Sequence, residues 1–102
     1  MDSIRAAIPH REPFLFVDEI VEEEPDLLRT RWRVPPEADF LRGHYPGRPL
    51  VPGVILCESA FQAGAILCAR ETEAAGPDAV PVLTRIGEAR FKRMVGPGET
   101  VE

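Results

Sequence analysis

One apolar run, residues 54–69, constrains the fold of this chain more than any other feature. It follows a loop rich in glycine and proline, and it is shorter than the ~20 residues that a bilayer requires. Its side chains are apolar almost all the way round a helix, whereas a surface helix keeps a polar half. The sequence therefore predicts a core helix from Gly53 to about Arg70, enclosed on most sides by other elements.

Strand patterns lie on both sides of this helix. Residues 13–21 are rich in aromatic and β-branched side chains, and the charged stretch 21–26 with its proline predicts a turn. Apolar residues and arginines alternate in residues 27–34, which predicts a second strand antiparallel to the first. Residues 82–95 predict a third strand with a bulge at Gly87. An enclosed helix with strands before and after it indicates an α+β domain.

The length and charge of the chain restrict its assembly and its binding partners. The 102 residues form one small domain, near the size at which a single core becomes marginal, so we expect either oligomerisation or further chain. A net charge of −5 argues against general binding to nucleic acid or to anionic membranes. The first residues show no signal peptide, so we expect a cytoplasmic location. Cys57 and Cys68 lie eleven residues apart, roughly 16 Å along a helix, so we expect buried free thiols.

An acid within the apolar helix is the first element of a candidate site. Glu58 must be hydrogen-bonded, paired or held neutral there, because an unpaired buried charge is costly. One interpretation is structural: Glu58 and Gln62, four residues apart, form a narrow wet face of the helix. The other is functional, because His44 precedes the acid by fourteen residues in a loop that its glycines and prolines restrict. A lone loop histidine is usually solvated, but this arrangement suits an acid–base pair.

The chemistry of such a pair depends on opposite protonation states. A neutral imidazole accepts a proton, and a carboxyl kept protonated by apolar surroundings donates one. The backbone N–H of Gly53, at the positive end of the helix dipole, can polarise a carbonyl oxygen. Together these groups suit removal of a proton next to a carbonyl with loss of a leaving group. We expect no metal site, since His10 and His44 are the only histidines and no ligand cluster accompanies them.

Three segments carry a family resemblance: IPHREPFLFVDEI, GHYPGRPLVPGVILCESAFQAGA and GEARFKRMVGPGE. They resemble the FabZ-type 3-hydroxyacyl-acyl-carrier-protein dehydratases of fatty-acid synthesis. The resemblance implies the hotdog fold, a long helix wrapped by an antiparallel sheet. The family usually continues beyond Glu102, so we expect C-terminal strands of that fold to be missing from a single hotdog dehydratase domain over residues 1–102. The related FabA type has an aspartate on the helix, so Glu58 favours the FabZ type.

The resemblance also implies roles for the candidate residues. His44 takes the C2 proton of a 3-hydroxyacyl thioester and Glu58 protonates the departing 3-hydroxyl, which leaves a trans-2-enoyl thioester and water. The N–H of Gly53 holds the thioester carbonyl, and no cofactor is needed. The implied partners are an acyl carrier protein, which is acidic, and a second copy of the chain. Family members form homodimers in which the histidine and the acid of each site come from different chains, and they often assemble further into hexamers.

Supporting roles are open between function and structure. Gln62 either orients Glu58 or only packs, and Phe91 either lines the acyl tunnel or fills the core. The one concentrated basic stretch either docks the carrier or is an ordinary solvated strand face; its members are Arg90, Lys92 and Arg93. For His10 and Arg11 we expect structural roles.

Two rival functions follow from the same fold. One is a non-catalytic hotdog module that binds acyl groups or only dimerises, and incomplete strands favour it. The presence of both His44 and Glu58 speaks against it, because binding alone needs neither. The other is a hotdog thioesterase, and the GHYPG loop speaks against that function because thioesterases of this fold generally lack its histidine. The sequence therefore predicts a dehydratase.

Overall fold

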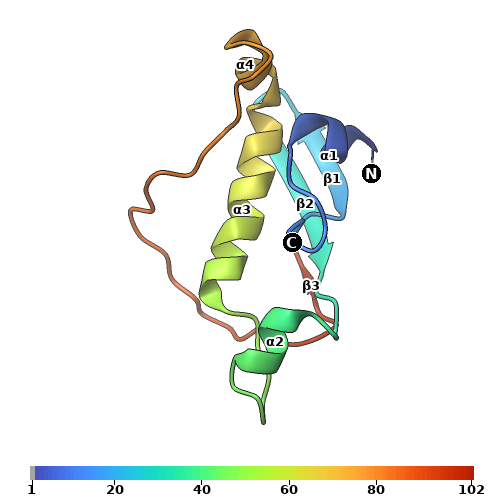
Figure 1. Cartoon of the computed structure of the whole chain (residues 1–102), viewed down its shortest axis with the longest axis vertical. Coiled ribbons are helices and arrows are strands. Elements are labelled where there is room, and N and C mark those ends of the chain that lie inside the picture. The colour runs from blue at the N-terminus through green and yellow to red at the C-terminus, as the bar shows by residue number, and fades with distance from the viewer. Residues whose placement is uncertain (1) are drawn as a thin grey trace.

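A central helix packed on a small antiparallel sheet forms the body of the protein (Figure 1). The computed structural model describes residues 2–102, apart from the side chains of residues 2 and 70. The central helix α3 spans Gly53–Leu67 and packs against strand β2. The sheet has the order β1-β2-β3, with β1 at Glu19–Glu24, β2 at Leu27–Arg33 and β3 at Thr100–Val101. The shorter helices are α1 at Asp2–Ala7, α2 at Asp39–Gly43 and α4 at Ala69–Ala74.

The hairpin of β1 and β2 confirms the alternation expected for residues 27–34. Trp32 is buried and the arginines of β2 are exposed. Strand β1 begins later than predicted and includes acidic residues that were expected to form a turn, of which Glu22 pairs with Arg29 at 2.9 Å. Residues 13–18 are not a strand because side chains of α3 bind their backbone: Phe16 N–H donates to Gln62 Oε1, and Phe16 O accepts from Ser59 Oγ.

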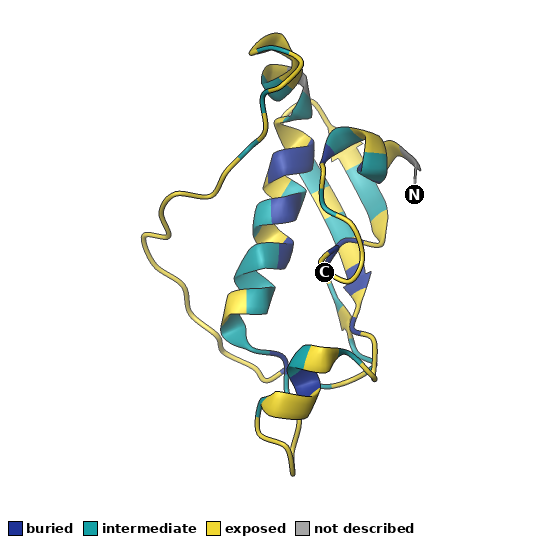
Figure 2. Cartoon of the chain, in the orientation of Figure 1, coloured by how far each residue is buried: buried dark blue, intermediate teal, exposed yellow. Residues whose placement is uncertain are grey.

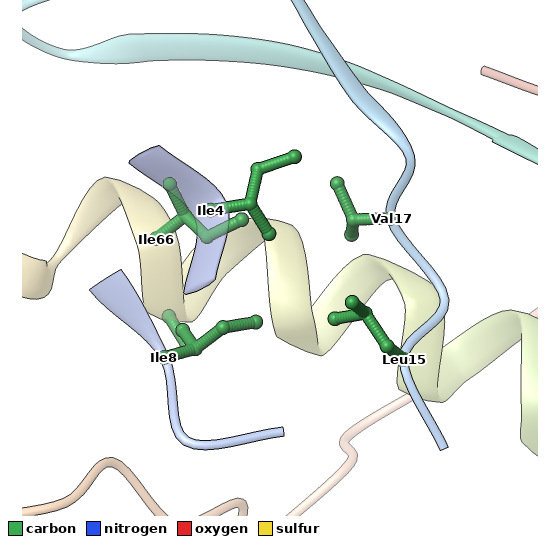
Figure 3. Close-up of a cluster of buried hydrophobic side chains, with 6 residues drawn as sticks. Ile4, Ile8, Leu15, Val17 and Ile66 are labelled. Atoms are coloured by element: carbon green, nitrogen blue, oxygen red, sulfur yellow. The ribbon is translucent and has the colours of Figure 1, made fainter. Parts of the chain in front are cut away.

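Two apolar clusters fill the space between α3 and its neighbours. The first joins α1 and the segment after it to the C-terminal half of α3 (Figure 3); it contains Ile4, Ile8, Leu15, Val17, Ala65 and Ile66. The second lies under α2 and β2; it contains Phe16, Trp32, Val34, Leu41, Val51 and Val95. Both clusters draw on the segment from Leu15 to Val17, so this irregular stretch holds the two halves of the core together.

The prediction that α3 is enclosed on most sides is wrong for the single chain. Its buried residues form one stripe, whereas Val54 remains 75% exposed (Figure 2). The helix also ends earlier than expected, at Leu67, because the backbone turns at Cys68 before α4 begins. Both cysteines are free, but Cys57 is only partly buried and Cys68 is exposed, which corrects the expectation of buried thiols. One face of α3 is therefore unpacked within a single chain.

The third predicted strand is also wrong. Residues 82–94 run as an irregular arc beside α3 and are exposed, and Gly87 makes no bulge (Figures 1 and 2). A strand needs a neighbouring edge for its backbone hydrogen bonds. Within the described part of the chain, the backbone of the arc makes no such bond, and the first one comes just after it, where Val51 N–H donates to Val95 O at 2.7 Å. Its apolar side chains, such as Val82 at 69% exposed, are left in water.

Within the described residues, every helix falls short of the length or the apolar character that a membrane crossing demands.

Candidate active site

Glu58 lies on α3 with most of its side chain shielded. The side chain is 19% exposed, and its Oε2 accepts a hydrogen bond from Gln62 Nε2 at 3.1 Å. The two residues are one helical turn apart, so they lie on the same face of α3, as their spacing predicts. In the described residues Glu58 Oε1 has no hydrogen-bond partner. One oxygen of the acid is therefore held and the other is open.

Gln62 is fully buried, and each of its polar atoms has a partner. Its Oε1 accepts from Phe16 N–H at 2.7 Å, and its Nε2 donates to Phe14 O and to Glu58 Oε2, both at 3.1 Å. Because a backbone N–H only donates, it fixes which end of the amide is oxygen. The amide nitrogen must then face Glu58. Gln62 thus contacts the acid and also ties the N-terminal segment to α3.

His10 is a neighbour of Glu58 that the sequence analysis placed only in a structural role. Its Nε2 lies 3.4 Å from Glu58 Oε2, and its side chain is 17% exposed. The ring stacks with Phe14 and meets Phe61 edge-on, with centroid separations of 6.5 and 6.2 Å. No spacing rule links residues so far apart in the sequence. The only available signal was that His10 lies within the first of the three segments that resemble the dehydratase family.

Arg11 has a structural role, of the kind expected for both Arg11 and His10. Its guanidinium donates to three backbone carbonyls: Arg5 O at 3.0 Å, Ile8 O at 2.9 Å and His10 O at 2.7 Å. The last carbonyls of a helix lack intrahelical donors, and a nearby cation satisfies them favourably. Arg11 therefore caps the end of α1 and holds the backbone of His10 in place.

His44 lies in the loop directly after α2, away from Glu58. Its Nδ1 is 3.0 Å from Leu50 O, and its ring meets that of Tyr45 edge-on. The polar contacts of Glu58 within the described chain go to His10 and Gln62, and His44 is not among them. A single copy of the chain therefore does not bring the expected acid–base pair into contact.

Gly53 opens α3 beside a shallow cavity of ≈ 470 Å³. The cavity is lined by Leu50, Val51, Gly53, Leu56, Phe91, Lys92, Arg93, Met94 and Val95. Pro52, at the N-cap, makes no side-chain hydrogen bond to the first turn within the described structure, so it does not cap the N–H groups there. A Cβ on Gly53 would lie 2.8 Å from the ring of Phe91, so glycine permits this close approach. Leu56 is about 200° round the helix from Glu58, so the cavity and the acid are on different faces.

The basic stretch predicted to dock a carrier contains both paired and unpaired charges; its members are Arg90, Lys92 and Arg93. Arg90 pairs with Glu88 at 3.1 Å, and Arg93 pairs with Glu99 at 2.8 Å. The Arg93 guanidinium and the Gly96 N–H hold the pKa of Glu99 below its ordinary value. Lys92 makes no ion pair with any residue that the structure describes. Exposed pairs of this kind are weak, so the arginines remain available to a stronger acidic partner.

Comparisons with known proteins place the chain in a family. The sequence model of the FabA-like domain matches residues 8–102. This chain belongs to the FabA-like family. Its α+β arrangement around a central helix is the hotdog fold of that family, which confirms the fold expected from the sequence. The FabA-like match extends across α3 and includes His44 and Glu58.

Relatives of this FabA-like chain share one name, 3-hydroxyacyl-[acyl-carrier-protein] dehydratase FabZ. The protein from Herpetosiphon aurantiacus is 40% identical over 103 residues, which cover 100% of this chain and 72% of the relative. That from Chloroflexus aggregans is 41% identical over 102 residues, covering 99% and 69%. That from Nitratidesulfovibrio vulgaris is 40% identical over 100 residues, covering 97% and 65%. The chain thus spans about two thirds of the length of these relatives.

Proposed function

We propose that this FabA-like chain dehydrates 3-hydroxyacyl thioesters carried by acyl carrier protein to trans-2-enoyl thioesters in fatty-acid biosynthesis. It would act as a single hotdog domain over residues 1–102. The names of its relatives support this reaction. The observation that carries the proposal is the state of Glu58: a shielded carboxyl on an apolar helix, with Oε2 held by Gln62 and Oε1 open. A cytoplasmic location stays a prediction from the sequence.

The mechanism assigns one task to each group. His44 accepts the proton from C2 of the substrate, and Glu58 donates a proton to the 3-hydroxyl as the C3–O bond breaks and water leaves. The electron pair of the C2–H bond forms the new double bond. The first-turn N–H groups of α3, that of Gly53 first, stabilise negative charge on the thioester oxygen. The cavity beside Gly53 and Phe91 would take part of the acyl chain, and no cofactor has a task in this scheme.

Two features of the single chain support a homodimer with composite sites. His44 and Glu58 do not meet within it, so a second copy would have to bring one to the other. The exposed arc 82–94 and the unpacked face of α3 offer apolar surface for a second copy; the large exposed apolar side chains of the arc are Val82, Leu83, Ile86, Phe91 and Met94. Hexamers, which the family resemblance implies, stay a prediction.

One assay separates this proposal from its rivals. The protein is incubated with a 3-hydroxyacyl thioester, and both enoyl absorbance and free thiol are followed. A dehydratase produces enoyl product, a thioesterase produces free thiol, and a binding module produces neither. We expect His44→Ala and Glu58→Gln each to abolish enoyl formation. Glu71→Gln, which changes an exposed acid on α4, is the matched control and should behave as the original protein does.

Complementation tests the composite site directly. His44→Ala and Glu58→Gln chains are unfolded together and refolded as a mixture. In a mixed dimer with composite sites, one site combines the intact His44 of one chain with the intact Glu58 of the other. The second site contains both substitutions and is inactive. Since half of randomly paired dimers are mixed, about a quarter of the original activity should return. If each site were built from one chain, the mixture would remain inactive.

Carrier docking by the basic stretch is a further part of the proposal. Lys92 has an uncompensated charge among the described residues and lines the cavity beside Gly53. Arg90 and Arg93 can exchange their present partners for carboxylates of an acidic carrier. Binding would then weaken as ionic strength rises, since exposed charges are screened.

A further inference from the structure

His10 and Gln62 approach the same oxygen of Glu58. Gln62 Nε2 lies 3.1 Å and His10 Nε2 lies 3.4 Å from Oε2. The first distance is a hydrogen bond, and the second is slightly longer than the usual limit of about 3.2 Å. Catalytic contacts are often long before substrate binds and tighten in the complex. The gap that remains between the two atoms is about 0.2 Å.

The surroundings of the other ring nitrogen decide which nitrogen of His10 carries the proton. Nδ1 is buried and has no hydrogen-bond partner among the residues that the structure describes. A neutral imidazole has one N–H and one acceptor nitrogen. An N–H on Nδ1 would be buried without an acceptor, whereas an N–H on Nε2 points to Glu58. Of the two neutral tautomers, the one protonated on Nε2 is therefore favoured.

Two donors on Oε2 determine which oxygen of Glu58 can carry a proton. The amide of Gln62 is oriented by Phe16 N–H, so it presents an N–H group to Oε2. His10, with its Nε2 at 3.4 Å, is placed to present a second N–H to that same atom. The proposed reaction requires Glu58 to donate a proton, and an oxygen held by two donors then serves as the carbonyl oxygen, which leaves Oε1 to carry the proton. That oxygen is the open one.

We propose that His10 is a positioning residue for Glu58: its Nε2–H, with the Gln62 amide, holds Oε2 so that Oε1 delivers the proton to the departing hydroxyl. This inference rests on the proposed dehydratase function. The Oε1–H bond breaks, the proton joins the 3-hydroxyl, the C3–O bond breaks and water leaves, while His44 takes the C2 proton. The rings of Phe14 and Phe61 keep the imidazole in place, and Arg11 holds its backbone carbonyl.

Three substitutions of His10 separate positioning from packing. His10→Phe keeps an aromatic ring beside Phe14 and Phe61 but removes the donor. His10→Gln keeps an N–H group near the position of Nε2, and His10→Asn presents one nearer that of Nδ1. With a small 3-hydroxyacyl thioester, we expect His10→Phe and His10→Asn to lower kcat about tenfold with KM little changed. His10→Gln should recover most of the loss. Folding of each variant is checked by thermal unfolding.

Unchanged kcat in His10→Phe, or a His10→Gln variant no better than His10→Asn, would overturn the inference. A second measurement does not depend on activity: long-range proton–nitrogen NMR of the original protein should show the His10 ring protonated on Nε2. A proton on Nδ1 would equally overturn it. If the original protein lacks dehydratase activity, or if Glu58→Gln keeps it, the proposed function fails, and the NMR result then decides the Nε2–H contact by itself.

Discussion

Replacing Gln62 by methionine is the sharpest test of how the site is built into the fold. Methionine keeps the length of the side chain but removes the amide. Phe16 N–H then loses its partner in a buried position, and Phe14 O loses one in a partly buried position. A buried backbone group without a partner costs about 1–3 kcal/mol, which applies in full to Phe16 N–H and only in part to Phe14 O. Better burial of an apolar side chain offsets part of this, and we expect a net loss of about 1–3 kcal/mol.

Urea unfolding at a fixed protein concentration measures this loss. A slope of about 2 kcal/mol/M converts it to a midpoint lowered by about 0.5–1.5 M. Ser59→Ala is the graded comparison, since it removes a single hydrogen bond to Phe16 O and should cost about 1 kcal/mol. Glu71→Gln, on the exposed surface of α4, should stay within about 0.5 kcal/mol of the original protein.

The result that refutes this reasoning is a Gln62→Met protein whose midpoint and slope both match the original. The backbone of residues 14–16 would then not depend on the amide, and the late start of β1 would need another cause. A lower slope would instead indicate a change in the compactness of the native or unfolded state.

Three further predictions concern other parts of the chain. Gly64→Ala should raise the free energy of unfolding by about 0.5–1 kcal/mol, because alanine favours a helix more than glycine does and Gly64 lies in α3. The added Cβ would have no neighbouring residue within 4 Å. A loss of stability would mean that a second copy covers that face of α3. The pKa of Glu102 is lowered by a hydrogen bond from Arg29 and, to a smaller extent, by one from Arg31. The stability that Glu102 contributes is therefore present above its unfolded pKa of about 4.3 and is lost as pH falls through its lower folded pKa. Over that fall in pH, the urea midpoint of Glu102→Gln should drop less than that of the original protein. Lys92→Glu should raise KM about three- to tenfold for a carrier-bound substrate at low salt and should raise KM for a small thioester clearly less. Equal effects on both substrates would argue against docking.

Features with a local cause could be predicted from the sequence. The start of α3 at Gly53 follows from the change from a glycine- and proline-rich loop to a continuous apolar run. The alternation of β2 follows from the period of two in residues 27–34. The spacing of Glu58 and Gln62 predicts their contact, because one helical turn makes them neighbours. The dehydratase resemblance also lies in contiguous motifs, and the family match supports it.

Features that depend on distant partners needed the tertiary structure. The contact of His10 with Glu58 joins two segments that share no periodicity, and only the packing of the N-terminal segment on α3 brings them together. Residues 13–18 have strand composition, but buried side chains of α3 bind the backbone there in place of a neighbouring strand. Residues 82–94 also have strand composition, yet they form an arc because a strand exists only where a second edge meets it. Composition records what a segment favours, whereas its partners decide what it becomes.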